Sequence, residues 1–256
     1  MEVVRLEREA GVAVLTLSRP AVRNAMNDAM LMEELPAAIA ELRRDDGVRA
    51  VVVTGEGQDF CAGADLVENS GWSQTDPAAA AEFVRKSCEP AVRLAQLQQP
   101  TIAAVNGAAV GAGVGLAIAC DFRIASSTAS FRTPFVSFGI VPDFGITYFL
   151  PRIVGYGRAL DILTTCRRVD AAEAERIGLV DRLADPALDA ALELARAIAK
   201  MPAAAVRATR RNLLASFDVD LETEVFSHEA DAQAVLMQSP EFFERFAAYR
   251  KTIVRS

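Results

Sequence analysis

Two loops rich in small residues could present backbone N–H groups to a ligand. The first is TGEGQDFCAGADL at residues 54–66, and the second is NGAAVGAGVGLAIACD at residues 106–121. Each follows a short apolar strand, and its glycines and alanines let a ligand approach the backbone closely. In the second loop a helix then begins, whose first N–H groups are unpaired and favour negative charge on a ligand. Two such donors aimed at one carbonyl oxygen would form an oxyanion hole.

Other interpretations of the second loop are weaker. The uncharged run from Leu94 to Cys120 is long enough to cross a membrane, but Pro100 breaks its start, and Asn106 and four glycines interrupt it. A dinucleotide-binding loop would need the spacing G-x-G-x-x-G and an acidic residue at the distance that the ribose requires, and both are missing. Small residues could also serve tight strand-to-helix packing alone. Because two such loops follow two strands, we favour the donor interpretation.

A carboxylate must accompany these donors, because an oxyanion hole by itself moves no protons. Asp143 lies in IVPDFG, among valine, proline, phenylalanine and glycine. Apolar surroundings should raise its pKa toward the range that suits proton transfer. Pro-Asp is also common turn chemistry, so a loop-capping role is the alternative. With both donor loops present, the catalytic role is the better hypothesis.

The predicted elements mix strands and helices up to about residue 186 and are helical from there on. Apolar runs and turn residues predict strands at 3–8, 12–17, 49–55, 101–107 and 121–126, and a helix leading into a strand at 170–183. Helical spacing and stop signals predict helices at 28–44, 78–98, 112–120, 146–154 and 156–166, with loops at 68–77 and 130–146. Pro36 should kink the first helix or mark a restart. We therefore predict an α/β core at 1–186 that carries the site, and a helical C-terminal region at 187–256.

Composition and charge limit the class of protein. The chain has 256 residues, of which 52% are hydrophobic and 24% charged, as is typical of a globular protein with one sizeable core. A net charge of -7 disfavours nucleic acid and anionic membranes as partners, because both require a concentrated basic face. The N-terminal segment lacks the pattern of a signal peptide, so we expect a cytoplasmic protein. Four scattered cysteines and the single His228 predict neither a metal site nor a disulfide framework.

Four motifs together resemble the successive signatures of the enoyl-CoA hydratase/isomerase family, the crotonases, in order and at the expected spacing. They are RPAVRNAMN (19–27), GEGQDFCAGADL (55–66), NGAAVGAGVGLAIACD (106–121) and PDFGITYFLPRIVG (142–155). The resemblance covers nearly the whole chain. It implies a spiral of ββα units, a helical C-terminal region, and an acyl-CoA thioester as substrate, with no cofactor beyond the coenzyme A of the substrate itself. It also places the two oxyanion donors on the backbone N–H groups of Ala64 and Ala112.

The sequence departs from the family where its hydratases carry two glutamates that hold and activate a water molecule. The resemblance places those positions on Gly115 and Phe135, neither of which can act as an acid or a base. This departure argues against efficient hydration of a 2-enoyl-CoA. The segment TPFVSFGIVPDFGITYFLPRI resembles instead the Δ3,Δ2-enoyl-CoA isomerases and the isomerases of phenylacetate breakdown, which carry an acidic residue at the place of Asp143. There, one carboxylate removes a proton next to the thioester and returns it two carbons along, so that the double bond moves.

Three alternatives to double-bond isomerisation remain open. A ring-rearranging isomerase of phenylacetate-CoA catabolism would share the same acidic loop. A hydratase-like enzyme would need another group as its base. A non-catalytic acyl-CoA-binding protein would keep the donor loops and lose the chemistry. Substrate tests and an Asp143→Asn variant separate these functions.

The resemblance also suggests residues that contact coenzyme A. It places the adenine side of coenzyme A near Ala62, Asp65 and Leu66, although Asp65 could instead fix its own loop by hydrogen bonds to the backbone. Arg23 is a candidate for a phosphate contact, although an exposed surface arginine is the equal alternative. Lys251, with its neighbour Arg250, resembles a basic site that reaches coenzyme A, in some relatives from a neighbouring subunit.

Aromatic side chains and the C-terminal helices complete the prediction. Trp72, Phe135 and Phe138 are candidates for the acyl pocket, although lone aromatic residues are more often ordinary packing. The family resemblance implies trimers or pairs of trimers. Apolar stripes that one domain need not bury by itself lie at Leu188, Leu192, Ala195, Ile198, Val225, Leu236, Phe243 and Phe246. We therefore predict a homotrimer or hexamer and assign the C-terminal region to oligomerisation.

Overall fold

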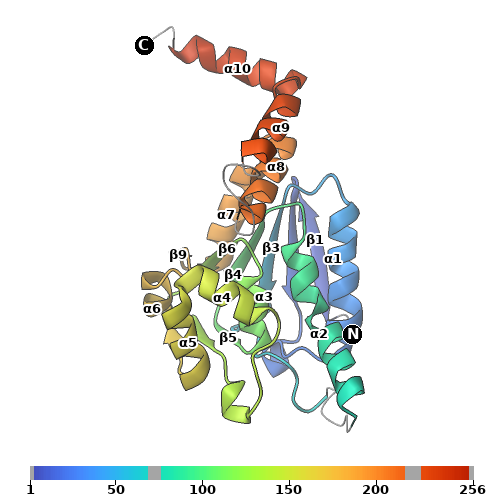
Figure 1. Ribbon diagram of the computed structural model, residues 1–256, viewed down its shortest axis with the longest axis vertical. Coiled ribbons are helices and arrows are strands. Elements are labelled where there is room, and N and C mark those ends of the chain that lie inside the picture. The colour runs from blue at the N-terminus through green and yellow to red at the C-terminus, as the bar shows by residue number, and fades with distance from the viewer. Residues whose placement is uncertain (1–2, 69–75, 217–225, 254–256) are drawn as a thin grey trace.

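The protein, described here by a computed structural model over residues 3–68, 76–216 and 226–253, is built on a six-stranded sheet (Figure 1). In their order across the sheet the strands are β1 (Val4–Glu9), β2 (Val12–Leu17), β3 (Ala50–Gly55), β4 (Thr101–Val105), β6 (Phe122–Ala125) and β9 (Arg182–Leu183). β1 and β2 form the predicted antiparallel hairpin, and every later strand joins in parallel. Ala10 and Gly11 both have positive φ, as a two-residue hairpin turn requires.

A second, three-stranded sheet contains elements that the sequence pattern does not predict. β5 (Ala108–Val110) pairs in parallel with β7 (Ser130–Arg132), which pairs antiparallel with β8 (Val169–Asp170). The expected loop at 130–146 therefore contains a strand, and it also contains the short helix η4 (Val136–Phe138). Strands of two or three residues are too short for hydrophobic alternation to reveal. β5 matters for function because it leads directly into the second donor loop.

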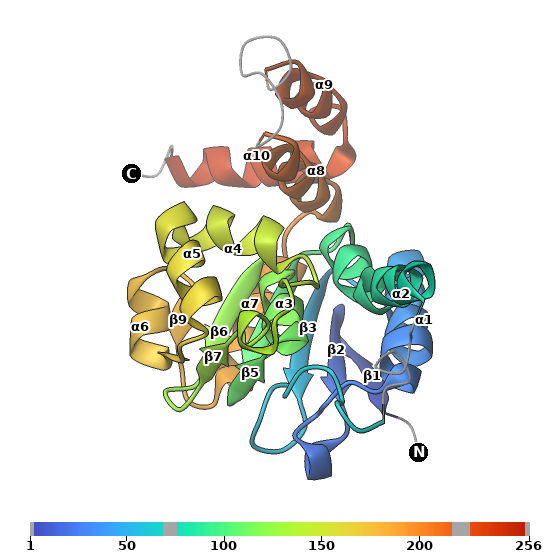
Figure 2. The same cartoon turned by 60° about the horizontal axis from the view of Figure 1, so that its bottom comes forward.

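Helices cover both faces of the main sheet (Figure 2). One face carries α1 (Leu35–Arg44), α2 (Pro77–Ala95) and α3 (Ala112–Ile118), and α4 (Ile146–Val154) packs against α3. Pro36 is the second residue of α1, and a π-helical turn at Met30–Glu34 runs into α1 without a break, since Glu34 and Leu35 both have right-handed helical backbone angles. The predicted helix at 28–44 is therefore continuous, and it does not restart at Pro36 but contains a π-helical turn just before it.

The opposite face of the sheet is covered by α7 (Ala187–Ala199). Alanines one turn apart on α7 pack against a buried cluster that includes Val52 of β3. Because neighbouring residues of a strand point to opposite faces, Val51 and Val53 join the core on the other side. β3 is thus buried on both faces, as its unbroken apolar sequence predicts. α7 shares this core although it lies beyond residue 186, and the division into core and oligomerisation region stays a prediction.

The last three helices extend away from the sheet (Figure 1). The body of the protein, which contains both sheets, also includes α5 (Tyr156–Thr165) and α6 (Ala171–Arg176). The C-terminal extension consists of α8 (Ala203–Ala215), α9 (Phe226–Leu236) and α10 (Pro240–Ile253). Arg210 ties α8 to the body by donating to the Asp121 carboxylate at 2.7 Å and to the Leu97 carbonyl oxygen at 2.6 Å. The extension is therefore anchored at α8 by a partly buried polar contact.

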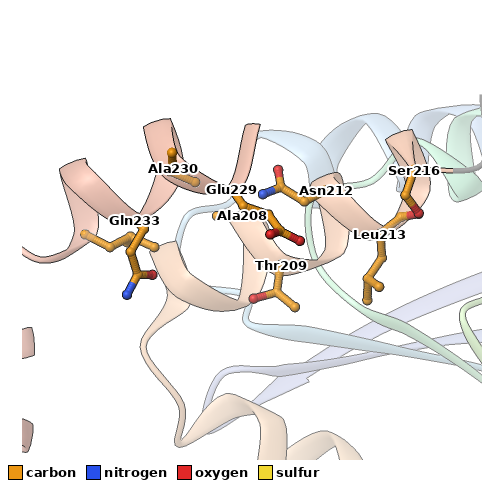
Figure 3. A pocket seen from close by; sticks show the side chains of 10 residues that line it. Ala208, Thr209, Asn212, Leu213, Ser216, Glu229, Ala230 and Gln233 are labelled. Carbon is orange, nitrogen blue, oxygen red and sulfur yellow. The ribbon is translucent and has the colours of Figure 1, made fainter. Parts of the chain in front are cut away.

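Apolar side chains and a cavity mark the surface of this extension. A cavity of about 630 Å³ lies between α8 and α9 (Figure 3). Leu213 of α8 and Phe243 of α10 are exposed. A trimer or hexamer would bury such side chains, and the assembly stays a prediction.

None of the helices in the described ranges combines the length and the apolar character that a membrane crossing requires. The uncharged run from Leu94 to Cys120 is instead divided among the end of α2, the strands β4 and β5, and α3. Its length reflects consecutive buried elements rather than one long helix.

Candidate active site

Asn24 fixes the course of the first donor loop after β3. Its side chain is fully buried, and its Nδ2 group donates to the carbonyl oxygens of Glu56, Asp59 and Phe60 at 3.0, 2.8 and 3.2 Å. Its Oδ1 atom accepts the backbone N–H of Arg19 at 2.9 Å. The two N–H bonds of one buried amide are thus shared among three carbonyl groups that a turning loop leaves without strand partners.

The N–H group of Ala64 points away from the segment that holds its loop. Met26 donates its N–H to the Gly63 carbonyl oxygen at 2.8 Å and accepts the N–H of Asp65 at 2.9 Å. Along an extended chain, the N–H groups of successive residues point to opposite sides. Since the N–H of Asp65 faces Met26, the N–H of Ala64 faces the other way.

β5 brings the second donor loop alongside the first. Cys61 donates its N–H to the Ala108 carbonyl oxygen at 3.0 Å and accepts the N–H of Val110 at 2.9 Å. Cys61 is therefore paired in parallel with Ala109. The end of this short pairing is where both loops reach their candidate donors.

The two predicted donors, Ala64 and Ala112, lie side by side as a result. Three residues beyond the pair formed by Cys61, they are counterparts on the two chains, and a Cβ atom built on Gly63 would lie 3.5 Å from the Ala112 nitrogen. Gly111, at a φ of 54°, caps α3, so Ala112 is the first helical residue and its N–H has no acceptor within the helix. Among the residues that the structure describes, neither donor N–H is bonded to an acceptor. Both are available to a ligand oxygen.

Gly115 brings Asp143 toward these donors by letting another loop rest on α3. It lies one turn after Ala112, and a Cβ atom built on it would lie 2.5 Å from the Cβ of Phe144 and 2.9 Å from the Phe144 oxygen. Phe144 is buried and has a φ of 54°, and Asp143 precedes it directly. The loop that carries Asp143 therefore packs on the helix whose first residue supplies the second donor.

Burial governs the chemistry of Asp143. Loss of solvation raises the pKa of its carboxyl group to about 6. Its Oδ1 atom is buried and has no hydrogen-bond partner within the described parts of the chain. Cys88 of α2 supports the same loop, because its Sγ atom accepts the N–H of Phe144 at 3.3 Å. Burial and the charge of Asp143 raise the pKa of that thiol to about 11, so the thiol stays neutral at physiological pH.

Apolar groups fill the two positions where hydratases of the family are expected to carry glutamates. Phe144 occupies the space beside Gly115, as its contact distances require. Phe135 is buried, and its Cζ atom lies 3.8 Å from the place of a Cβ atom on Gly111, next to the second donor. The structure thus sets an aromatic ring beside Gly111, the residue before the second donor.

Four of the predicted coenzyme A residues lie in or against the first donor loop, namely Arg23, Ala62, Asp65 and Leu66. The carbonyl oxygen of Arg23 accepts the N–H of Ala62 at 2.9 Å, while the exposed guanidinium of Arg23 pairs with Asp59 at 2.6 Å. Leu66 is exposed. Asp65 is only 7% exposed, and its carboxylate accepts two backbone N–H groups of its own loop at 3.0 Å and pairs with an arginine. The side chain of Asp65 therefore fixes the loop, which is the alternative role considered for it.

Other candidates lie farther from a buried site or outside the described residues. Phe138 ends η4 with 63% of its surface exposed, so its ring is not a buried pocket wall in a single chain. Trp72 and the side chain of Lys251 lie outside the described residues. His228 is exposed on α9. Within the described ranges, no group of three or more His, Cys, Asp or Glu side chains could hold a metal ion.

Sequence reasoning missed three residues that support the site, namely Arg19, Asn24 and Cys88. Arg19 and Asn24 belong to the motif RPAVRNAMN, which was therefore the available signal. Cys88 stands inside α2 without any local signal, and only the fold brings it to the loop of Asp143.

Comparison with known proteins decides the family. The family model described as enoyl-CoA hydratase/isomerase matches residues 7–252. The chain belongs to the enoyl-CoA hydratase/isomerase family. It is 38% identical over 231 residues to the short-chain-enoyl-CoA hydratase of Clostridium acetobutylicum, a match that covers 89% of this chain and 87% of that protein. It is 34% identical over 256 residues to 4-chlorobenzoyl coenzyme A dehalogenase-1 of an Arthrobacter species, with 99% and 92% covered.

Solved structures of the family share the fold. The enoyl-CoA hydratase from Bacillus anthracis superposes with a TM-score of 0.90 at 32% identity, covering 98% of this chain and 96% of that chain. The predicted crotonase-type α/β fold with a helical C-terminal region is therefore confirmed. The family unites hydratases and isomerases, so the reaction of this member has to be argued from its own residues.

Proposed function

We propose that this protein is an isomerase that moves the double bond of an acyl-CoA thioester through an enolate, with Asp143 as the single proton carrier. One observation carries the proposal. The loop of Asp143 packs on α3 beside the donor pair, while Gly115 and Phe135 leave no acid or base at the two hydratase positions.

The reaction would begin with the thioester carbonyl oxygen accepting the N–H groups of Ala64 and Ala112. The Asp143 carboxylate would take a proton from the carbon next to the carbonyl, and the negative charge would move to the oxygen held by the two donors. The resulting carboxylic acid of Asp143 would return the proton two carbons along. The carbon–carbon double bond then lies next to the thioester, and no water is consumed. A pKa of about 6 suits both steps, because the group is mostly ionised at neutral pH and readily protonated.

Hydration is the main competitor, since many relatives are named hydratases. Adding water to a 2-enoyl-CoA requires a base that activates the water. Phe135 would exclude water from the side of the second donor, and Phe144 fills the space beside Gly115. These two groups favour proton transfer within the substrate over addition of water.

Other reactions of the same enolate or carboxylate also deserve a test. A ring-rearranging isomerase of phenylacetate-CoA catabolism would use the same donors and the same Asp143 loop. The Arthrobacter relative is named a 4-chlorobenzoyl coenzyme A dehalogenase, and a carboxylate can serve as a nucleophile in such chemistry. A non-catalytic acyl-CoA-binding protein would show binding with no turnover of any of these substrates.

We further propose that coenzyme A binds along Arg23, Ala62 and Leu66, that the enzyme works in the cytoplasm, and that it assembles as a trimer or hexamer. The exposure of Leu66 and the Arg23 guanidinium beside the first donor loop supports the first part. Exposed apolar residues of the last helices, such as Leu213, support the third. A stable monomer in sedimentation at micromolar concentration would refute the assembly.

The test compares the wild-type protein with Asp143→Asn on a 3-enoyl-CoA and on a 2-enoyl-CoA, with products followed by chromatography and mass spectrometry. Isomerisation of the 3-enoyl-CoA should fall by about 10²–10⁴-fold in the variant, the usual contribution of a general base. An exposed aspartate supplies the matched control, Asp46→Asn, which should keep full activity. Gain of one water on the 2-enoyl-CoA, kept in Asp143→Asn, would contradict the proposal. Chloride release from 4-chlorobenzoyl-CoA would favour the dehalogenase alternative.

A further inference from the structure

Arg19 holds the two segments that flank Ala64, although it contacts neither candidate donor. Its side chain is 11% exposed, which is low for an arginine. Its Nη1 atom donates to the Ala25 carbonyl oxygen at 2.6 Å and to the Asp65 carboxylate at 2.9 Å. Its Nη2 atom donates to the Glu68 carboxylate at 2.7 Å. One guanidinium group therefore spans both chains of the pairing that orients the first donor loop.

The bond to Ala25 acts on the supporting segment. Ala25 directly precedes Met26, whose N–H and carbonyl groups bond Gly63 and Asp65 on either side of Ala64. If this segment shifts, both peptide groups around Ala64 turn with it. Arg19 thus restrains Ala25, the neighbour of Met26, and the backbone of Met26 holds the peptide groups around Ala64.

The bond to Asp65 acts on the donor loop itself. The other carboxylate oxygen of Asp65 accepts the N–H groups of Val67 and Glu68, both at 3.0 Å. Burial alone would raise the pKa of Asp65, but these hydrogen bonds and the Arg19 guanidinium hold it below its usual value. Asp65 therefore stays ionised and keeps its pairing geometry throughout the neutral pH range.

We propose that Arg19 is a positioning residue that sets the direction of the Ala64 N–H, and through it the strength of the oxyanion hole. The inference rests on the proposed role of Ala64 as an oxyanion donor. A planar guanidinium can bond the two segments and Glu68 at once, whereas an ammonium group is a point charge on a flexible stem. Replacing Arg19 should therefore weaken stabilisation of the enolate more than it weakens binding of the acyl-CoA.

The experiment measures hydrogen bonding in the oxyanion hole by infrared spectroscopy of bound butanoyl-CoA labelled with ¹³C at the thioester carbonyl. This saturated ligand has no double bond to move, so the carbonyl frequency reports hydrogen bonding without turnover. The wild-type protein is compared with Arg19→Gln, Arg19→Lys and the control Arg167→Gln. Arg167 is also held by two carboxylates, those of Asp161 and Glu173, but on α5 and α6. Calorimetry gives the affinity for butanoyl-CoA, and steady-state kinetics give kcat and KM for a 3-enoyl-CoA.

The wild-type protein should shift the carbonyl stretch to lower frequency than in water, and Arg19→Gln should lose a large part of that shift. Its kcat should fall by about 10–100-fold, less than the 10²–10³-fold that complete loss of a donor costs. KM and the affinity for butanoyl-CoA should change less than about threefold, because the acyl-CoA still binds while the transition state is less stabilised. Arg19→Lys should lie between Arg19→Gln and the wild-type protein, and Arg167→Gln should match the wild-type protein.

An unchanged carbonyl frequency in Arg19→Gln would overturn the inference, and so would a wild-type protein that causes no shift. If Arg19→Gln fails to fold, Asp65→Asn carries the test, because it keeps the side-chain shape and removes the charged partner. Loss of the shift in Asp65→Asn supports the inference, and its retention overturns it. An Arg19-dependent shift in a protein that does not isomerise 3-enoyl-CoA would support this inference while refuting the proposed function.

Discussion

One added carbon atom at Gly115 should reduce the rate of catalysis strongly while it reduces the stability of the fold only slightly. In Gly115→Ala the new Cβ atom would stand 2.5 Å from the Cβ of Phe144, whereas carbon atoms in contact are ordinarily about 3.5–4.0 Å apart. The loop of Asp143 must therefore move outward by about 1 Å, a displacement that costs about 10²-fold in rate when it misplaces a catalytic group. Overpacking costs about 1–3 kcal/mol, and the better helix propensity of alanine returns about 1 kcal/mol. We expect a net loss of stability of about 0–2 kcal/mol.

The matched control is Gly157→Ala in α5, where no atom lies within 4 Å of the added Cβ. This variant should keep full activity and gain up to about 1 kcal/mol of stability from the same gain in helix propensity. Urea unfolding gives the free energy of unfolding for both variants, and kcat with a 3-enoyl-CoA gives the activity. If Gly115→Ala is as active and as stable as Gly157→Ala, the packing of the Asp143 loop on α3 does not position the base, and the reasoning is wrong.

Four further predictions follow from the same site and from the anchor of α8. The kcat/KM for a 3-enoyl-CoA should rise with pH around a midpoint of about 6, because Asp143 must be ionised to act as a base, and a profile flat between pH 5 and 7 would contradict this. The raised pKa also means that the folded protein binds a proton at Asp143 more tightly than the unfolded chain does. The contribution of this group to stability is therefore highest below pH 4 and falls as pH rises through 6. At pH 8, urea unfolding of Asp143→Asn should give a free energy of unfolding that is higher by up to about 3 kcal/mol, and no gain would show that burial of the carboxylate is slight. Cys88→Ala should lower kcat and cost about 1 kcal/mol of stability because the Phe144 N–H loses its acceptor, whereas Cys88→Ser should be milder, and equal kinetics of both variants would remove this role. Arg210→Met should cost about 1–3 kcal/mol in urea unfolding because the Asp121 carboxylate loses its charged partner, and an unchanged midpoint would show that α8 is held by other contacts.

Some elements of the fold could be predicted from a few neighbouring residues in the sequence. The turn at Ala10 and Gly11 and the doubly buried strand β3 each follow from a few neighbouring residues. Small residues before and after position 111 similarly indicate a strand-to-helix junction with unpaired N–H groups. These features need no knowledge of distant contacts.

Other features depend on contacts between distant segments and leave no local pattern. β5 and β7 have three residues each and exist because they pair with each other and with the loop at Cys61. Cys88 reaches the Asp143 loop only because α2 packs beside α3. Gly115 is a further example. In the sequence it shows only that the hydratase glutamate is missing, whereas in the structure its lack of a side chain lets Phe144 pack against α3. The carboxylate of Asp65 likewise turned out to be occupied by Arg19 and by its own loop.

The most direct test of the central claim is product analysis of one incubation of a 3-enoyl-CoA with wild-type protein, run beside Asp143→Asn. We expect conversion to the 2-enoyl isomer at unchanged mass, with the rate falling by about 10²-fold or more in the variant. A product heavier by one water, or isomerisation that persists in Asp143→Asn, would contradict a single buried carboxylate as the proton carrier.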